Sequence, residues 1–385
     1  MSLTPIESVS LIPADNGFAI GAVLLGLAFM GFWLDSHPIG RKTSGMVWIL
    51  IVAMLLSNFG ITPLEAPAYG FVGQYMVSLA IPMLLLKANI GLILRESGKL
   101  LIVFTLATIA TVAGAIIGFF LLDLGEIGPK VAGVYTGGWV GGAVNFLAVS
   151  EVVEMTDSEF TSAISASSVV SITALMVLIA LPSIKWVTRH IPTKFEDSMS
   201  EEEKRRLRDE ARPHVRLKHL TGVLALSFLI CAVANALAEF IKLPHFAILF
   251  VTILTIIIAN LLAPLMKKIE GDFEMGMIFM YIFFAMVGSA TDATEFLDSA
   301  VILLVYGMLI IGIHILVVLL VARVLKIDLA EAIVASGAAL VGPAATAAIA
   351  ISRGWRSLIT PGIMCGIFGY VIGTFIGVAV TKLLI

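Results

Sequence analysis

The feature that most constrains this chain is a succession of long apolar segments that contain almost no charge. Charged residues make up 13% of the sequence, whereas soluble domains carry about 25%. A helix needs roughly 20 mainly apolar residues to cross a bilayer. Twelve segments approach that length: 16–34, 43–60, 69–94, 99–122, 127–153, 158–183, 218–241, 244–264, 273–297, 299–325, 329–352 and 357–383. The sequence therefore predicts an all-α, polytopic protein of the cytoplasmic (inner) membrane with about 12 transmembrane helices, in the range 11–13.

Several functional classes are disfavoured by what the sequence lacks. It contains no Walker loop, zinc motif or nucleophile elbow, so we expect neither an enzyme nor a resident cofactor apart from a bound Na⁺. The formal net charge is −3 and no basic stripe predicts a nucleic-acid partner. The two cysteines, Cys231 and Cys365, each lie in an apolar segment, so we do not expect a disulfide framework.

One long polar interval divides the chain. Residues Lys185 to Lys218 hold 10 of the 24 Lys and Arg residues. Clustered Lys and Arg favour the cytoplasmic side of a membrane. We therefore expect a first transmembrane repeat over 1–184, a charged cytoplasmic linker over 185–217 and a second transmembrane repeat over 218–385.

The two halves resemble each other when the second is laid on the first with a shift of about 200 residues. Asn89 falls on Asp292, a shift of 203, and Gly141 falls on Gly342, a shift of 201. The same shift of 201 puts Asn145 on Thr346. Weak similarity between halves is typical of transporter repeats.

Charge placement predicts opposite orientations for the halves, as inverted repeats require. Basic residues follow the first and third spans, and later the sixth, eighth and tenth spans (Arg41, Lys42, Arg95 and Lys99; then the linker, Lys267, Lys268, Arg323 and Lys326). Six plain crossings per half would nevertheless give both halves the same orientation. One segment must be re-entrant, split or missing, and the sequence leaves these alternatives open.

The segment Tyr135–Ser150 carries the strongest local signal. It combines Thr136 and Asn145 with four glycines (Gly137, Gly138, Gly141 and Gly142). Because each glycine costs a helix about 1 kcal/mol relative to alanine, a continuous helix is doubtful here. Unwound backbone is tolerated in a membrane only where it is buried or lines a watery cavity, and there it can hold ions or anionic groups. The alternative is close helix packing through small residues.

The corresponding segment of the second half contains Gly342, Pro343 and Thr346. Proline removes a backbone donor and disrupts the preceding turn. Two interrupted spans at matching places predict a binding site near the bilayer midplane. We expect Asn145 and Thr346 to face each other there as ligands.

Three further residues are candidates for ion or substrate binding. Lys87 lies within an apolar span, so it could pair with a bound carboxylate or with Asp292, or else extend its ammonium group to the interface. Asn89 and Asp292 occupy matching positions. A Na⁺ site near Asp292, Thr291 and Asn145 would use hard oxygen ligands, whereas the alternative is a solvated helix end. A row of hydroxyl side chains in the sixth span (Ser165, Ser167, Ser168, Ser171 and Thr173) could line a pathway or bond its own backbone.

Three stretches, TGGWVGGAVNFLAV, VGPAATAAIAISRGWRSLITPGI and GIFGYVIGTFIG, resemble the YjcL-like integral membrane proteins of unknown function. That family is similar in turn to the superfamily of cation/proton antiporters and bile-acid sodium symporters. The resemblance implies two inverted repeats, a panel or dimer domain that would form a homodimer, and a core domain with two crossed discontinuous helices. This chain has Val341-Gly342-Pro343 where Gly-Gly-Pro is expected, and serines where antiporters carry carboxylates.

We therefore predict an ion-coupled secondary transporter, using Na⁺ or H⁺, for a small polar or anionic organic solute. The alternatives are a cation/proton antiporter and a membrane subunit of a sodium-pumping enzyme complex. The expected partners are the solute, the coupling ion, the lipid bilayer and a second copy of the chain.

Overall fold

The computed structural model describes residues 10–37, 45–195 and 216–385, and within these ranges every regular element is a helix. The longer helices of the first half follow the apolar segments closely: α1 (Gly17–Ser36), α3 (Gly45–Asn58), α4 (Pro67–Leu85), α6 (Leu100–Leu121), α7 (Gly128–Val152) and α8 (Asp157–Ala180). Those of the second half are α11 (Leu217–Phe240), α12 (Ala247–Leu261), α14 (Asp272–Ser289), α15 (Ala293–Leu325), α16 (Leu329–Leu340), α17 (Gly342–Ser352) and α18 (Arg356–Leu384). Short pieces connect them: α5 (Ile90–Ser97), η1 (Gly125–Ile127), η2 (Leu181–Ser183), α9 (Lys185–His190), η3 (Pro244–Phe246) and α13 (Ala263–Met266).

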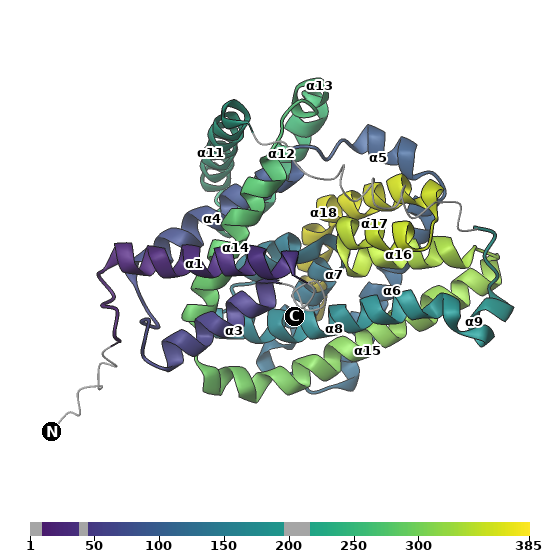
Figure 1. The fold of residues 1–385 in the computed structure, drawn as a ribbon, viewed down its shortest axis with the longest axis horizontal. Coiled ribbons are helices and arrows are strands. Elements are labelled where there is room, and N and C mark those ends of the chain that lie inside the picture. Colours follow the sequence, from purple (N-terminus) through teal and green to yellow (C-terminus); the bar gives the residue numbers. More distant parts are fainter. Residues whose placement is uncertain (1–9, 38–44, 196–215) are drawn as a thin grey trace.

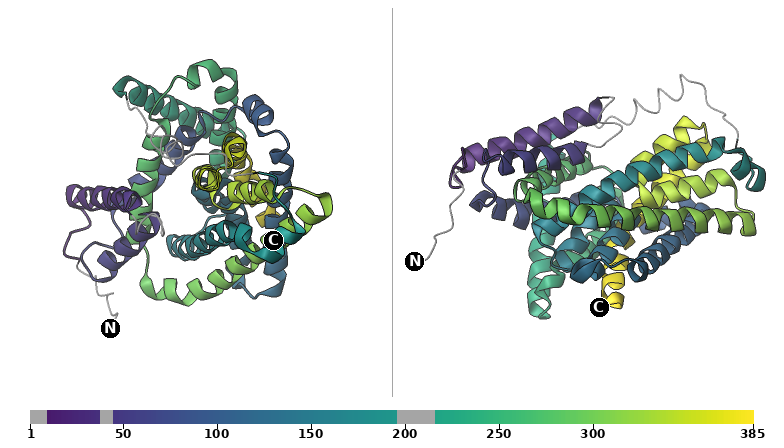
Figure 2. Two further views of the ribbon diagram at one scale, coloured as in Figure 1. Left: turned by 45° about the vertical axis from the view of Figure 1, so that its right-hand side comes forward. Right: turned by 90° about the horizontal axis from the view of Figure 1, so that it is seen from below.

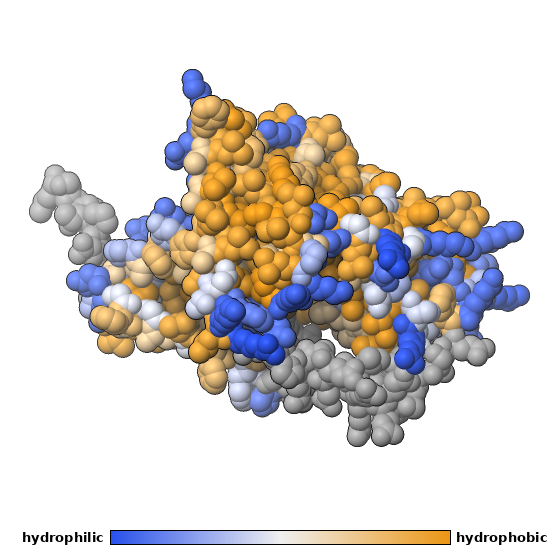
Figure 3. Space-filling model, turned by 90° about the horizontal axis from the view of Figure 1, so that it is seen from above, coloured by the Kyte–Doolittle hydropathy of each residue, from blue (hydrophilic) through white to orange (hydrophobic). Residues whose placement is uncertain are grey.

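The surface of the protein is that of a multi-pass membrane protein. Eight of the described helices are long and apolar enough to cross a bilayer. Large apolar side chains such as Phe18 and Phe240 are 96% and 84% exposed. The face drawn in Figure 3 is largely apolar, with polar side chains confined to patches. Exposing this much apolar surface to water would be energetically unfavourable, whereas contact with lipid is not.

The helices form two groups (Figures 1 and 2). The panel consists of α1, α3, α4, α11, α12 and α14, and the core consists of α6, α7, α8, α15, α16, α17 and α18; contacts are dense within each group and sparse between them. Each group takes helices from both halves of the chain: the first three of each half form the panel, and the remainder form the core. Residues 196–215 of the expected linker lie outside the described residues, so the expected division at 185–217 is untested there.

Helix α7 is a hairpin that folds back at Gly142. The φ angle of Gly142 is 73° and its ψ is −176°, a conformation that suits only glycine. A Cβ atom on Gly137 would lie 2.7 Å from Cγ2 of Val149, although residues twelve apart are roughly 18 Å apart in a straight helix. The two arms therefore lie side by side, and we name them the first hairpin.

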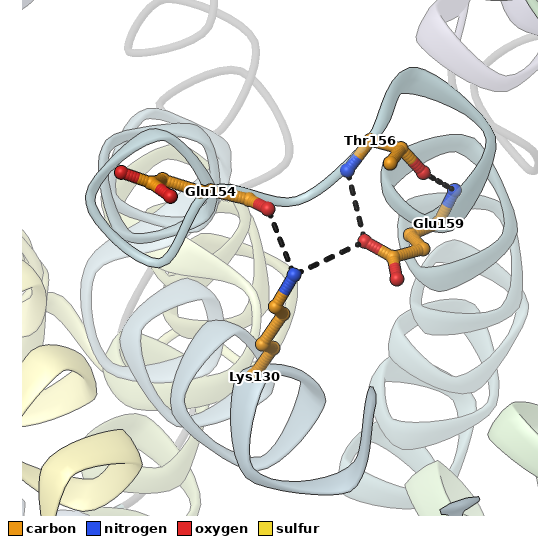
Figure 4. Close-up of polar contacts among 4 residues, drawn as sticks. All are labelled: Lys130, Glu154, Thr156 and Glu159. Carbon is orange, nitrogen blue, oxygen red and sulfur yellow. Dashed lines mark hydrogen bonds and ion pairs between the residues drawn. The ribbon is translucent and has the colours of Figure 1, made fainter. Parts of the chain in front are cut away.

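The base of the first hairpin is fastened by Lys130 (Figure 4). Its Nζ donates to the carbonyl oxygen of Glu154 at 2.8 Å and lies 3.6 Å from Oε2 of Glu159. Thr156 and Glu159 form a capping box that starts α8. The residue that begins the hairpin thus contacts the residues that follow it, so both ends lie on one side of the molecule.

Helices α16 and α17 form the second hairpin, which turns at Gly342. Gly342 has a φ of 82°, and Pro343 occupies the first turn of α17, where its missing N–H costs nothing. A Cβ atom on Gly337 would lie 3.1 Å from Oγ1 of Thr346 and 3.3 Å from Cδ1 of Ile349. The expected pair of crossed discontinuous helices is therefore wrong. Both interrupted segments turn back, because the positive φ at each glycine reverses the chain.

The two hairpins enter the molecule from opposite ends. The first hairpin has its base beside Glu159 at the start of α8. The residue that follows the second hairpin, Arg353, donates to the carbonyl oxygen of Ile179 at the other end of α8. Helix α8 spans 24 residues, about 36 Å. We call the end that holds Ile179 and Lys185 the linker end.

Glycines join the first hairpin to α18. Gly133, Gly137 and Gly141 on α7 face Gly377, Gly373 and Gly369 on α18 in antiparallel order. A Cβ atom on Gly373 would lie 2.8 Å from Cα of Gly141 and 2.9 Å from the carbonyl oxygen of Gly137. Small residues at such intervals let two backbones approach directly, which supplies packing energy where lipid offers no hydrophobic drive.

Two asparagines mark a reciprocal relation between the halves. Asn58, at the end of α3, donates to the carbonyl oxygen of Thr291 at 2.8 Å and accepts from the N–H of Ala293 at 3.0 Å. Asn260, on α12, donates to the carbonyl oxygen of Ala88 at 3.2 Å and accepts from the N–H of Ile90 at 2.8 Å. Each side chain thus satisfies the backbone at a helix break in the other half.

We predict that Gly373→Ala lowers the thermal stability of the purified protein, because its methyl group would force α18 away from α7. Overpacking of this kind costs about 1–3 kcal/mol. Gly312→Ala is the matched control, since a Cβ atom there meets nothing within 4 Å and alanine favours a helix by about 1 kcal/mol. Melting temperatures in detergent distinguish them, and equal effects of the two changes would contradict the packing described.

Candidate functional site

The tips of both hairpins line one cavity of about 570 Å³. Gly142 and Ala143 come from the first hairpin, and Val341 and Ala344 come from the second. The serines predicted on the sixth span contribute in part, since Ser167, Ser168 and Ser171 face this cavity. We call it the tip cavity. It places two backbone turns opposite a row of hydroxyl groups.

Tyr370 of α18 lies between the two tips. A Cβ atom on Gly142 would lie 2.9 Å from Cε1 of Tyr370, and one on Gly342 would lie 3.6 Å from its hydroxyl oxygen. One aromatic side chain therefore touches both glycine turns. Any alanine at Gly142 would collide with this ring as well as strain the backbone.

The start of α17 offers backbone donors to the cavity. Its N-cap, Val341, provides no side-chain cap, and Ala344 and Ala345 in its first turn line the tip cavity. Helix N-termini carry a partial positive charge and unpaired N–H groups. This turn can therefore receive an anionic group or the negative end of a dipole.

A second cavity, of about 860 Å³, adjoins α17 on its other side. We call it the side cavity. Its wall is mainly aliphatic, and its charged groups are Lys87 and Asp272. Pro343, Ala344 and Tyr370 also line it, so α17 separates two spaces that share the second hairpin tip.

Lys87 pairs with Asp272, a residue that the sequence did not single out. Its Nζ lies 2.6 Å from Oδ1 of Asp272, and the two side chains are 45% and 4% exposed. The hypothesis of a pair between Lys87 and Asp292 is thus wrong, because α4 ends near the beginning of α14 instead of near its end. An ammonium group has three donors, so Lys87 can bind an anion while it stays paired.

Asn145 and Thr346 do not face each other. Asn145 is 3% exposed, and its Oδ1 accepts from the N–H of Thr374 at 2.9 Å and from its hydroxyl. Thr346 is fully buried and donates to the carbonyl oxygen of Gly342 at 2.8 Å. Both residues shape the hairpins, Asn145 by attaching the first one to α18 and Thr346 by closing the turn of the second.

The other residues expected from the first Gly-rich segment divide between packing and cavity. Thr136 is buried and donates to the carbonyl oxygen of Ala132 at 2.7 Å. Gly137 and Gly141 lie against α18. For these two glycines the structure therefore favours the alternative that they serve close helix packing. Gly138 and Gly142 line the tip cavity.

Asn89, Thr291 and Asp292 lie at helix breaks away from the hairpin tips. Asn89 caps α5 by accepting from the N–H of Leu92 at 2.8 Å. Thr291 contacts Thr161 at 2.6 Å between the two hydroxyl oxygens, whereas Asn145 is held by α18. The expected group of Asp292, Thr291 and Asn145 is therefore not assembled as one site.

One carboxylate of the tip cavity carries no signal in the sequence. Asp35, at the end of α1, lines this cavity. It accepts from the N–H of Gly45 at 2.6 Å and from the hydroxyl of Tyr281. An acidic residue next to the end of an apolar span does not indicate a binding site in the sequence, because most acidic residues at that position lie at the membrane–water interface. Tyr281 and Tyr370 lacked a signal for the same reason, since aromatic residues are common in spans.

A row of aromatic rings begins at the tip cavity, where Phe146 lines the wall, and runs toward the panel at the end opposite the linker end. Phe146 of the first hairpin, Phe160 of α8 and Phe283 of α14 are each at most 3% exposed. Successive ring centroids are 5.7 and 5.8 Å apart in edge-to-face geometry. This aromatic row connects the core to the panel. Edge-to-face pairs contribute about 0.5–1.5 kcal/mol each beyond area burial.

Comparisons with known proteins agree with the membrane architecture. The model of a family described as "Protein of unknown function (DUF819)" matches residues 22–385. The chain is also 30% identical over 384 residues to the "Uncharacterized membrane protein YjcL" of Bacillus subtilis (strain 168), an alignment that covers 96% of this chain and 97% of that protein.

We predict that Lys87→Met destabilises the protein, because it leaves the buried Asp272 carboxylate without its partner. The loss should be about 1–3 kcal/mol, below the range for fully buried pairs because Lys87 is half-exposed. The double variant Lys87→Met/Asp272→Leu should recover most of it. Melting temperatures of the unmodified protein, the two single variants and the double variant form a double-mutant cycle. A double variant less stable than either single variant would contradict the pairing.

Proposed function

The chain belongs to the family described as proteins of unknown function (DUF819), and we propose that it is an ion-coupled secondary transporter. It would move a small polar or anionic organic solute, using Na⁺ or H⁺. One observation carries this proposal: the glycine tips of two hairpins from opposite ends meet at one cavity. Interrupted helices that converge on an internal site are typical of transporters.

An inverted topology follows from treating the hairpins as re-entrant. Each half then has five crossings and one hairpin, and an odd number gives the halves opposite orientations. The apparent conflict between six spans per half and the charge pattern disappears. The reciprocal contacts of Asn58 and Asn260, whose positions differ by 202, support the same pseudo-symmetry.

The charge distribution supports a cytoplasmic linker end. Of the described Lys and Arg residues, three lie at the other end: Lys130, Lys242 and Lys382. The remainder, including Arg95, Lys268, Arg323 and Arg356, lie toward the linker end. This asymmetry matches the preference of short cytoplasmic loops for Lys and Arg.

Alternating access would come from movement of the core against the panel, whose mutual contacts are sparse. The side cavity includes Ile179, Lys87 and Asp272, all toward the linker end, while the aromatic row lies toward the other end. These positions support an inward-open state for the present arrangement. Moving the core would open the aromatic row and close the side cavity.

The solute would bind at the second hairpin tip. The first turn of α17 supplies backbone N–H groups, and Lys87 supplies a positive charge at the edge of the side cavity. Both favour an anionic group. The serines of α8 would contact other polar parts of the solute.

A cation/proton antiporter is the second candidate, and Asp35 is the observation that favours it. A carboxylate at the tip cavity can carry a proton or bind a cation. The two functions differ in one experiment: proton flux in proteoliposomes driven by a Na⁺ gradient without any organic solute supports the antiporter, whereas its absence supports solute symport.

The transport assay uses proteoliposomes with an imposed Na⁺ or H⁺ gradient and radiolabelled acetate, succinate, citrate, glutamate and alanine. We expect gradient-dependent accumulation of at least one probe. Gly142→Ala should abolish it, because φ is 73° and the new methyl would meet Tyr370 at 2.9 Å. Gly26→Ala, where nothing lies within 4 Å, should transport normally. Uptake equal to that of empty liposomes for every probe would contradict the proposal.

A second prediction concerns the aromatic row. In a variant with a cysteine at Ala344, a membrane-impermeant maleimide should react from the linker side only. Adding Phe283→Ala should raise labelling from the opposite side by about tenfold, since the edge-to-face contacts that close the row are then lost. Phe71→Ala, at an exposed lipid-facing position, is the control. Unchanged labelling with Phe283→Ala would contradict the assignment of this row as a gate.

A further inference from the structure

A cluster of buried hydroxyl groups surrounds the break between α14 and α15. Thr62, Ser289 and Thr291 are at most 2% exposed, and Tyr69 is 6% exposed. The hydroxyls of Thr62 and Ser289 neighbour that of Tyr69, and Thr291 contacts Thr161 at 2.6 Å. Oxygen atoms from four separate segments thus gather at the end of α14, far along α8 from the linker end.

Two of these hydroxyls make no hydrogen bond of standard geometry among the described residues, although both lie beside the hydroxyl of Tyr69. They are those of Thr62 and Ser289. Buried polar groups are nearly always satisfied, and an exception points to a water molecule or an ion. Inside a membrane protein the cost of leaving such a group unpaired rises, because no bulk solvent is available.

The end of α14 adds negative potential to this cluster. The helix ends at Ser289, and its last carbonyl oxygens, through Gly288, accept from the N–H groups of Ala290 and Thr291. The C-terminus of a helix carries a partial negative charge, and Asp292 follows three residues later. Half-helix ends are among the groups that coordinate Na⁺ in transporters.

The matching break in the first half carries its own cation. With the shift of 203, Ala290 corresponds to Lys87, while Ser289 and Thr291 correspond to Leu86 and Ala88. The end of α4 therefore has a built-in ammonium group and no hydroxyls. The end of α14, by contrast, carries the hydroxyls of Ser289 and Thr291, and the residue that corresponds to Lys87 is the uncharged Ala290.

We infer that the α14–α15 break binds Na⁺ through the hydroxyl oxygens of Ser289, Thr62 and Thr291, at the negative end of α14. No group of three His, Cys, Asp or Glu side chains lies together within the described parts of the chain. The hydroxyl donors are neutral oxygens, which suit a hard monovalent cation better than a transition metal.

The position of this site gives Na⁺ a mechanical role, and this part rests on the proposed transport function. Tyr69 and Ser289 belong to the panel, whereas Thr161 belongs to the core. Thr291, which follows the panel helix α14, contacts Thr161, and this contact would separate if the core moved. A bound Na⁺ would therefore hold the two groups together in the inward-open state and couple its release to the movement.

The test measures Na⁺ binding without transport. The melting temperature of the purified protein is followed as NaCl replaces choline chloride or KCl at constant ionic strength. We expect a saturable, Na⁺-specific rise. Ser289→Ala should raise the apparent dissociation constant for Na⁺ by about tenfold, as loss of one supporting oxygen in a metal site does. If Na⁺ raises the melting temperature but the protein transports no probe, the proposed transport function is refuted and the inferred Na⁺ site still stands.

Ser227→Ala is the matched control, because Ser227 on α11 is also fully buried with an unpartnered hydroxyl. It should leave the response to Na⁺ unchanged. Thr62→Val and Thr62→Ser provide a second pair: valine should weaken Na⁺ binding and serine should retain it. The inference is overturned if KCl stabilises as well as NaCl, as a site filled by water predicts, or if Ser289→Ala and Thr62→Val respond to Na⁺ like the unmodified protein.

Discussion

The structure depends on the requirement that no backbone group stay unpaired in hydrocarbon. A helix broken in a membrane exposes N–H and C=O groups, so each break must be enclosed by protein. Gly142 and Gly342 break their helices with positive φ angles, and the chain turns back at both. The first hairpin then lies on α18 through facing glycines. Asn58 and Asn260 pair with backbone groups at the two other breaks, those that follow α14 and α4.

Enclosing the breaks in this way also produces the functional geometry. The turns lie inside the bundle, where their dipoles face a cavity instead of lipid. Because the hairpins return to the side from which they enter, each half has an odd number of proposed crossings, which would give the two halves opposite orientations. The panel and the core each contain the same three elements from both halves, so one movement between them could expose the tips to either side.

Much of the architecture could be predicted from local sequence. The apolar segments match the observed helices closely, since hydrophobic length is a strong signal. The glycine-rich interruptions were located correctly. Three of the serines on α8 line the tip cavity, although Ser168 also bonds its own backbone, as the alternative predicted. The reversal could not be predicted, because a helix that continues beyond a glycine and one that turns back have similar local sequences. The contact of Lys130 with Glu154 decides between them, and it is visible only in three dimensions.

The partners of polar residues were equally hard to predict. Lys87 pairs with Asp272, 185 residues away, and nothing in the spacing distinguishes it from Asp292. Asn145 and Thr346 had the right positions but bond to nearby backbone and to Thr374. The asparagine pair could have been found, since Asn58 and Asn260 align under nearly the same shift that relates the halves.

The most direct test of this account is the sidedness of the hairpin bases. Single cysteines at Glu126 and Asp157 flank the first hairpin, and those at Lys326 and Arg356 flank the second; all four positions are exposed. The account predicts that a membrane-impermeant maleimide labels the first two from one side of the membrane and the second two from the other. Labelling of Glu126 and Asp157 positions from opposite sides would mean that α7 crosses the bilayer, and the account would be contradicted.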